Sequence, residues 1–455
     1  MDRWLAAGLE YLSDWLEFQM RATEQPGCAI AVVQRGQVVL ERAYGHADAI
    51  RRRELTPRHR FRVASHSKTF TAAGIMKLRE RGRLSLDDRV GRYVPDLHRS
   101  VAATTLLQLL SHTAGVTRDG PDTGQWTDRR PFRSADEIRR DLGAAQPIDA
   151  NTRFKYSNHG FGLLGLVIEA ITGETYARWI QREIVDAAGL EETRPDVPLP
   201  RGARLARGHS AKLPLGRRLV IPGDNSTEGL AAATGFVSTA ADLARFFHQL
   251  APNARRSVLS VASRREMTRA HWRVPHSVVE RWYGLGTASG DVGGWHYFGH
   301  SGGFQGFITR TAVFPAHDLA LSILTNAADG FANVFLDGAV HVLRRFAVHG
   351  APARRNADWR GRWWSLWGCV DLVPMGSRVL VASPALLDPF TDASEIEVTG
   401  RDAGRIVLAS GYASHGEGVA RKRRRGRVAE IVLAGARLFD EERAARELEE
   451  RYDGR

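Results

Sequence analysis

The spacing of hydrophobic residues predicts a long helix at the start of the chain. Leu5, Leu9, Leu12 and Leu16 recur at helical intervals across residues 3–22, with acidic residues between them. The same periodicity predicts several helices between residues 65 and 190, interrupted by polar loops that contain proline. Further helices are expected over residues 239–247, 329–348 and 440–452.

Short runs of aliphatic and β-branched residues predict strands on both sides of this helical block. Residues 29–33 and 38–40 flank a polar turn and form a predicted hairpin, and residues 307–314 and 319–324 supply two more strands. Strands that lie before and after a helical block indicate one sheet built from distant segments. We therefore expect an α+β fold, in which an antiparallel sheet is flanked by helices and joined to a largely helical subdomain.

The pattern changes near residue 349, where a stretch with Gly350 and Pro352 is typical of a linker. Beyond it, short strands alternate with turns. We expect a main domain at 1–348, a linker at 349–357 and a small all-β domain, an antiparallel meander or barrel, at 358–455. The strands expected in this small domain cover residues 370–373, 379–381, 395–398, 406–409, 418–421 and 428–433.

The composition excludes several classes of protein. The chain has 455 residues, of which 43% are hydrophobic and 25% charged, as in ordinary globular proteins. Its net charge of +13 is spread along the chain and is not interleaved with aromatic residues, so we predict no nucleic-acid partner. The two cysteines, Cys28 and Cys369, lie far apart and form no metal-binding motif, so no metal is predicted.

The location of the protein follows from two further features. No apolar stretch approaches the ~18 residues of a membrane helix, so we predict no membrane span. Acidic residues occur early in the chain, which argues against a secretory signal. We expect a cytoplasmic protein.

The most specific local signal is Ser65-His66-Ser67-Lys68, at the start of a predicted helix. Residues three apart share a helix face, so the Ser65 hydroxyl and the Lys68 amine can meet. A serine becomes a nucleophile when a neighbouring base accepts its proton, and a lysine can be that base only if its pKa is lowered. Because arginine carries most of the positive charge in this chain, a lysine here indicates a group that must lose its proton. A capping serine followed by a surface lysine is the structural alternative.

Two further segments carry candidate chemistry. Tyr156-Ser157-Asn158 precedes a predicted helix, and a tyrosine beside an amide can relay a proton and orient a substrate carbonyl. Gly299-His300-Ser301-Gly302-Gly303 comes before a predicted strand, and its glycines let a substrate approach backbone N–H groups. A packed tyrosine with a capping asparagine, and a flexible turn with a solvated histidine, are the structural alternatives.

In this order and spacing, the three segments resemble those of the penicillin-recognising serine hydrolases. The resemblance is to the class C β-lactamase-like branch, which also contains esterases, transesterases and D-aminopeptidases. It covers roughly residues 24–347, and further matching pieces occur at residues 109–116, 161–169 and 233–239. It implies a β-lactamase/transpeptidase-like fold and an activity without a cofactor.

The resemblance also implies roles for individual residues. Ser65 would be the acylated nucleophile, Lys68 its proton acceptor, and Tyr156 the acid/base that serves the leaving group and the deacylating water. Asn158 would hold the substrate carbonyl or Lys68. The backbone N–H groups of Ser65 and Gly303 would form the oxyanion hole.

One departure from the family pattern concerns the strand residues expected to bind substrate, which are His300, Ser301, Gly302 and Gly303. β-Lactamases place a lysine, in K-T-G, where this chain has His300. A histidine is mostly neutral at pH 7, so the anchor for a substrate carboxylate is missing or depends on protonation. This argues against an efficient β-lactamase.

The predicted function is that of a serine hydrolase that works through an acyl-enzyme. Its substrate would be an ester or amide of a small molecule or of a short non-standard peptide, such as one that contains D-amino acids. A carboxylesterase or transacylase of the same fold is one alternative, and a catalytically idle relative used for binding or sensing is another. The sequence leaves open whether the chain forms a homo-oligomer.

Overall fold

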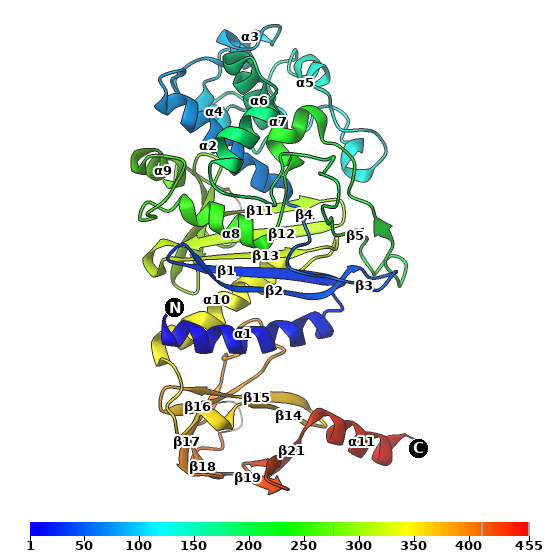
Figure 1. Ribbon diagram of the computed structural model, residues 1–455, viewed down its shortest axis with the longest axis vertical. Helices are drawn as coiled ribbons and strands as arrows, with labels where there is room; N and C mark the ends of the chain where they lie inside the picture. The colour runs from blue at the N-terminus through cyan, green and yellow to red at the C-terminus, as the bar shows by residue number, and fades with distance from the viewer. Residues whose placement is uncertain (276, 411–412, 454–455) are drawn as a thin grey trace. The chain divides into compact units, whose positions relative to one another are not determined.

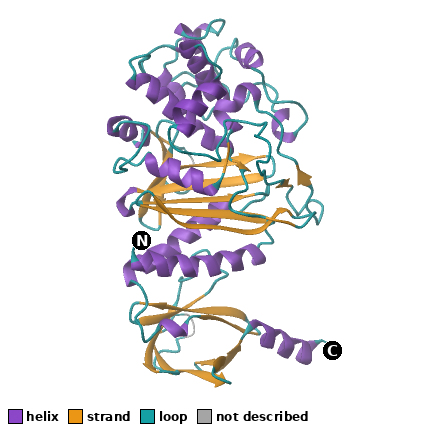
Figure 2. Ribbon diagram, viewed as in Figure 1, coloured by secondary structure: helices purple, strands orange, loops and turns teal. Residues whose placement is uncertain are grey.

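The computed structural model describes residues 1–275, 277–410 and 413–453 (Figures 1 and 2). These residues form two compact units. One contains residues 24–336, and the other combines residues 1–23 with the chain from residue 337 onward. The three-part division at residues 348 and 358 stays a prediction, and residues 411–412 and 454–455 of the expected small domain lie outside the described residues.

The unit of residues 24–336 is built on an antiparallel sheet with the strand order β3-β2-β1-β13-β12-β11-β10-β9-β8. The N-terminal hairpin pairs with a strand almost 300 residues later, so that Ala31 lies opposite Ser322. The predicted α+β fold is confirmed. The strands are β1 (Gly27–Gln34), β2 (Gln37–Asp48), β3 (Arg53–Glu54), β8 (Trp272–Arg273), β9 (Arg281–Tyr283), β10 (Ala288–Val292), β11 (Trp295–Phe304), β12 (Phe307–Phe314) and β13 (Leu319–Thr325).

The helices of this unit gather above the sheet in the view of Figure 1. Among them, α8 packs on strands β1, β12 and β13. Two short ladders, β4 (Phe61–Arg62) with β7 (Val237–Ser238) and β5 (Gly208–His209) with β6 (Val220–Ile221), lie outside the sheet. The helices are α2 (Ser67–Glu80), α3 (Arg99–Ala102), α4 (Leu106–Leu110), α5 (Ala135–Asp141), α6 (Asn158–Thr172), α7 (Tyr176–Ile180), α8 (Ala240–Gln249) and α9 (Val261–Thr268).

Helix α8 shows why the local sequence determines its position. The Thr239 hydroxyl accepts the N–H of Asp242 and caps the first turn. Leu243, Phe246 and Phe247 then follow at helical spacing, and all three are fully buried. The cap determines where the helix begins, and burial of its apolar face orients the helix against the sheet.

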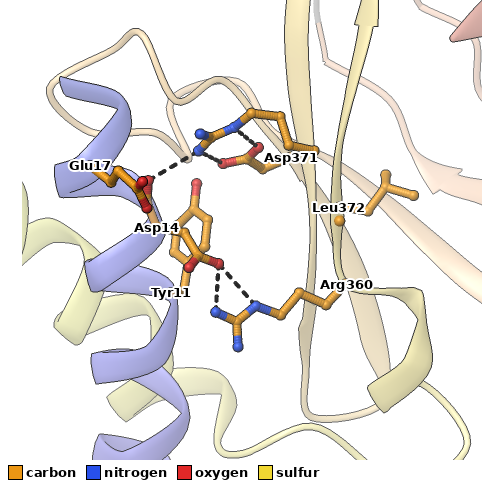
Figure 3. A pocket seen from close by; sticks show the side chains of 8 residues that line it. Tyr11, Asp14, Glu17, Arg360, Asp371 and Leu372 are labelled. Atoms are coloured by element: carbon orange, nitrogen blue, oxygen red, sulfur yellow. Dashed lines mark hydrogen bonds and ion pairs between the residues drawn. The ribbon is translucent and has the colours of Figure 1, made fainter. Parts of the chain in front are cut away.

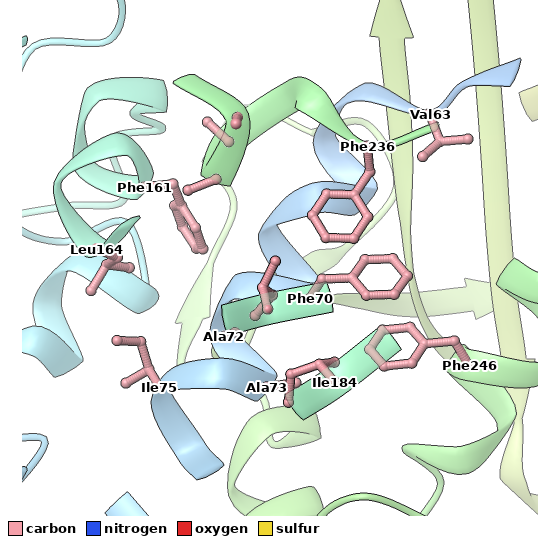
Figure 4. Packing of buried hydrophobic residues seen from close by; sticks show 14 of the residues in the cluster. Val63, Phe70, Ala72, Ala73, Ile75, Phe161, Leu164, Ile184, Phe236 and Phe246 are labelled. Carbon is pink, nitrogen blue, oxygen red and sulfur yellow. The ribbon is translucent and has the colours of Figure 1, made fainter. Parts of the chain in front are cut away.

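Helix α2 runs through the hydrophobic core (Figure 4). The Phe70 ring stacks on Phe236 at a centroid distance of 4.2 Å and on Phe246 at 3.9 Å. Residues 67–76 of the helix are all buried. A polar side chain on this helix is therefore removed from water, which matters for Lys68.

The unit of residues 1–23 and 337 onward contains helix α1 (Arg3–Ala22), most of α10 (Ala332–His349), a closed barrel and helix α11 (Glu441–Tyr452). The sequence predicted a meander or barrel here but missed the strands β14 and β21, which pair with each other and close the barrel. Trp359 and Trp363 fill its core together with aliphatic residues. The barrel strands are β14 (Gly361–Ser365), β15 (Gly368–Met375), β16 (Arg378–Ala382), β17 (Ser394–Gly400), β18 (Ala403–Leu408), β19 (Gly418–Arg424), β20 (Arg427–Leu433) and β21 (Ala436–Phe439).

Ion pairs join helix α1 to the barrel around a cavity of about 140 Å³ (Figure 3). Arg360 donates to Asp14 and Glu10 of α1, whereas Arg362 pairs within the barrel and donates to both oxygens of Asp371 at 2.7 and 2.9 Å. Both arginines are thus neutralised by carboxylates within this unit.

None of the helices in the described part of the chain is long and apolar enough to cross a membrane.

Candidate active site

Ser65 lies in a tight 3₁₀ turn, Ala64–His66, directly before helix α2. Ala64 has a φ of 47°, a left-handed conformation that is strained for a residue with a Cβ. The Ser67 hydroxyl donates to the Ala64 carbonyl at 2.5 Å and accepts the N–H of Phe236 at 3.0 Å. These bonds hold the turn, in which the Ser65 side chain is half-buried.

Lys68 follows one helical turn later and is fully buried. Its Nζ lies 3.2 Å from Ser65 Oγ, 2.7 Å from Asn158 Oδ1 and 2.8 Å from the carbonyl oxygen of Ala233. Burial lowers the pKa of the amine well below its ordinary value. A neutral amine can donate its two N–H bonds to Asn158 and Ala233, which leaves its lone pair for the Ser65 proton. The predicted proximity of Ser65 and Lys68 is therefore present.

Tyr156 contacts the same serine from the other side. Its hydroxyl donates to Ser65 Oγ at 2.7 Å, and Lys68 Nζ lies 4.7 Å from the centre of its ring. Burial raises the pKa of the phenol, so it stays protonated near neutral pH. The Ser65 hydroxyl therefore lies between an amine whose lowered pKa favours the form that can take its proton and a protonated phenol that can donate one.

Asn158 is the first residue of helix α6 and connects Lys68 to a residue that sequence reasoning missed. Its Nδ2 donates to Asp119 Oδ1 at 2.6 Å. The Ser157 hydroxyl caps the helix by accepting the N–H of Gly160 at 2.8 Å. No local pattern identifies Asp119, because only the approach of its loop to α6 brings it to Asn158.

The predicted substrate strand is part of β11. Strand β10 pairs with β11 up to Gly299, and in the described part of the chain no strand continues that edge along residues 300–303. A Cβ at Gly302 would lie 2.2 Å from the carbonyl oxygen of Val63, so the strand can pass this close to the nucleophile turn only with glycine there. Ser301 and Gly303 are exposed. This placement is compatible with the oxyanion donors predicted at Ser65 and Gly303.

His300 is buried, not solvated as in the structural alternative of a flexible turn. Its Nδ1 donates to the carbonyl of Ser301 at 2.6 Å, and its Nε2 accepts the hydroxyl of Tyr283 at 3.0 Å, a tautomer assigned from these partners. Burial lowers the pKa of His300 to about 3. Of the two alternatives that the sequence left open, this favours the one in which a permanent anchor for a substrate carboxylate is missing.

Two other histidines near the site hold the structure. The His66 ring bonds to the Val63 carbonyl at 2.9 Å and to Thr311 Oγ1 at 3.0 Å. His112 Nδ1 accepts the N–H of Ser157 at 3.1 Å, and its ring packs on Tyr156 with centroids 4.2 Å apart. Across the described residues, no group of three or more His, Cys, Asp or Glu side chains could hold a metal ion.

Parts of the sequence are similar to known proteins. The family model described as Beta-lactamase matches residues 12–343. Protein flp of Staphylococcus aureus (strain COL) is 31% identical over 169 residues, 36% of this chain and 34% of that protein. Penicillin-binding protein 4* of Bacillus subtilis (strain 168) is 31% identical over 172 residues, 36% of this chain and 37% of its own. The chain thus matches only about a third of the length of these curated relatives.

Solved structures share the fold. The octameric penicillin-binding protein homologue from Pyrococcus abyssi has a TM-score of 0.66 at 22% identity, over 95% of this chain and 100% of that one. The D-amino acid amidase from Ochrobactrum anthropi SV3, complexed with D-phenylalanine, has a TM-score of 0.65 at 22% identity, over 73% of this chain and 99% of that one. The protein belongs to the beta-lactamase family.

Proposed function

We propose that the protein is a serine hydrolase that cleaves ester or amide bonds through an acyl-enzyme on Ser65. One observation carries the proposal: the Ser65 hydroxyl lies between the buried Lys68 amine, at 3.2 Å, and the Tyr156 phenol, at 2.7 Å. A neutral amine in contact with a serine activates it as a nucleophile.

Acylation follows from these contacts. Lys68 takes the Ser65 proton as Oγ attacks the substrate carbonyl carbon, and the N–H groups of Ser65 and Gly303 bind the resulting oxyanion. When the carbonyl–leaving-group bond breaks, Tyr156 gives its proton to the leaving group and recovers one from the Lys68 ammonium. Deacylation reverses this order: a water loses its proton to the same pair and attacks the acyl carbon, and Ser65 regains its proton.

The substrate class that we propose is a neutral amide or ester, including amides of D-amino acids. Structural neighbours are titled as a D-amino acid amidase and as a D-stereospecific amidohydrolase. The neutral His300 supplies no permanent charge for a carboxylate such as that of penicillin. Transfer of the acyl group to an amine or alcohol instead of water uses the same intermediate.

A substrate panel tests the proposal. Wild type and Ser65→Ala would be assayed with p-nitrophenyl esters, D- and L-aminoacyl amides and a cephalosporin, with intact-mass detection of adducts. We expect turnover and an adduct in the wild type with a neutral ester or amide, and neither in Ser65→Ala. Ser263→Ala, at a buried serine of α9, is the matched control and should behave as wild type. Zero turnover across the panel would contradict the proposal and support the alternative of a catalytically idle relative used for binding or sensing.

We also propose that the chain associates with copies of itself. The support is the Pyrococcus abyssi homologue, which is octameric and matches 95% of this chain. Light scattering coupled to size exclusion measures the mass directly. A mass of 50.3 kDa at all concentrations would contradict self-association.

A further inference from the structure

Asp119 and Lys68 contact opposite ends of the Asn158 side-chain amide. Asp119 Oδ1 accepts Asn158 Nδ2 at 2.6 Å, and Asp119 Oδ2 lies 3.0 Å from Nε of Arg118. The Asp119 side chain is 5% exposed, whereas that of Arg118 is 65% exposed. The carboxylate is therefore shielded from water, while its counter-ion reaches the solvent.

The backbone fixes Asp119 against the start of α6. The carbonyl of Arg118 accepts the N–H of Asn158 at 2.9 Å. On the other side, Gly120 has a φ of +77°, and a Cβ there would lie 2.4 Å from Asp141 Oδ2. The glycine allows the chain to turn immediately after Asp119, so the carboxylate is held at the amide.

The orientation of this amide decides whether Lys68 can act as a base. A carboxylate only accepts hydrogen bonds, so Asn158 must present its NH₂ group to Asp119 and its Oδ1 to Lys68. In the reversed orientation, an amide N–H would point at the lone pair of the amine and compete with the Ser65 proton for it.

We propose that Asp119 is a positioning residue of the hydrolase: it locks the Asn158 amide so that the lone pair of Lys68 is directed at Ser65. This inference rests on the proposed function, in which Lys68 is the base. It assigns to the carboxylate an effect on catalysis that acts only through Asn158, without contact with the substrate.

The charge of Asp119 supplies an independent observable. The carboxylate raises the pKa of Lys68, against the larger lowering by burial, while Arg118 lowers it. The other titratable groups that face Lys68 are Tyr156, His112 and His300; burial raises the pKa of the phenol and lowers those of both imidazoles, so all three are neutral near pH 7. Removing the Asp119 charge should therefore lower the pKa of Lys68.

Three variants separate the two effects. Asp119→Asn keeps an acceptor oxygen for Asn158 but loses the charge, whereas Asp119→Ala loses both. Asp141→Asn is the matched control, because Asp141, the last residue of α5, also has a largely shielded carboxylate, 9% exposed, but pairs with His159 and Arg133 instead of Asn158.

Two measurements are made on each variant. The first is the pH dependence of Ser65 acylation by a neutral p-nitrophenyl ester, followed by mass. The second is the NMR titration of ¹³C-labelled lysine side chains, which reports the protonation of Lys68 even without activity. The spectrum is tractable because the chain has only these lysines: Lys68, Lys77, Lys155, Lys212 and Lys422.

We expect Asp119→Asn to move the Lys68 titration and the acid limb of acylation together to lower pH. Asp119→Ala should slow acylation on the pH plateau by about 10- to 100-fold, because the amide is no longer locked. Asp141→Asn should change neither. Wild-type titration and wild-type acylation in both Asp119 variants would overturn the inference. If Ser65 of the wild-type protein stays unmodified by the ester although the NMR titration shows the lowered pKa of Lys68, the proposed function is overturned instead.

Discussion

Replacement of Tyr156 by phenylalanine removes one oxygen atom and little else. The ring keeps its packing on His112, with centroids 4.2 Å apart, and its place 4.7 Å from Lys68 Nζ. The lost group is the hydroxyl that donates to Ser65 Oγ at 2.7 Å. The variant therefore isolates the proton-donating role of the phenol from its structural role.

The expected loss of kcat/KM is about 10²- to 10⁴-fold, the range typical of a positioned acid or base. This corresponds to about 3–5 kcal/mol of transition-state stabilisation. The free energy of unfolding should change by only about 1 kcal/mol, because one net hydrogen bond is lost and the apolar ring stays buried.

The assay compares Tyr156→Phe with Tyr176→Phe in steady-state hydrolysis of a neutral ester and in urea unfolding. Tyr176 is buried, whereas Tyr156 is half-buried, and the Tyr176 hydroxyl bonds to Thr71 Oγ1 at 2.7 Å, outside the proposed machinery. Both variants should lose similar stability, whereas only Tyr156→Phe should lose activity. A kcat/KM for Tyr156→Phe within tenfold of that of Tyr176→Phe would refute the role of the phenol.

Further expectations concern pH, charge and packing around the site. Activity on a neutral ester should rise with pH as the Lys68 amine, whose pKa is lowered, loses its proton. Above that pH the activity should stay level, because the pKa of Tyr156 is raised and the phenol keeps its proton. A fall in rate below about pH 10 would contradict this. The kcat/KM for an anionic ester, divided by that for a neutral ester, should stay constant between about pH 5 and 8, because burial lowers the pKa of His300 to about 3. In His300→Lys this ratio should increase. A ratio that climbs in the wild type as the pH falls through about 6.5 would reveal a titrating imidazole and contradict this. Gly302→Ala places a Cβ 2.2 Å from the Val63 carbonyl and should lower both kcat/KM and, by about 1–3 kcal/mol, the free energy of unfolding; wild-type stability in urea would show that the strand can move away.

The sequence predicted those elements whose limits are set locally. Helix α8 begins where its Thr239 cap stands and continues as far as its apolar stripe. The hairpin at residues 29–40 and the strands at 307–314 and 319–324 were also found, because each has its own turn and hydrophobic run. Strands β14 and β21 were missed, since their pairing is a long-range contact, Trp364 opposite Phe439, that no local pattern shows.

Some contacts of the candidate site could likewise be predicted from the sequence, whereas others depend on the tertiary structure. The contact of Ser65 with Lys68 follows from their spacing on one helix, and so it could be anticipated. The proximity of Tyr156 and Asn158 came from the family resemblance, and their distances to Ser65 and Lys68 support it. The role of Asp119 could not be found, because only tertiary approach brings it to Asn158. The further lowering of the His300 pKa depends on burial, which a sequence does not display.

The acyl-enzyme itself gives the most direct test of the central claim. The protein would be quenched during reaction with an activated ester or treated with a fluorophosphonate, digested, and mapped by tandem mass spectrometry. We predict a single adduct, on Ser65, which is absent from the Ser65→Ala protein. An adduct on a different residue, or one that persists after Ser65→Ala, would contradict the assignment of the nucleophile.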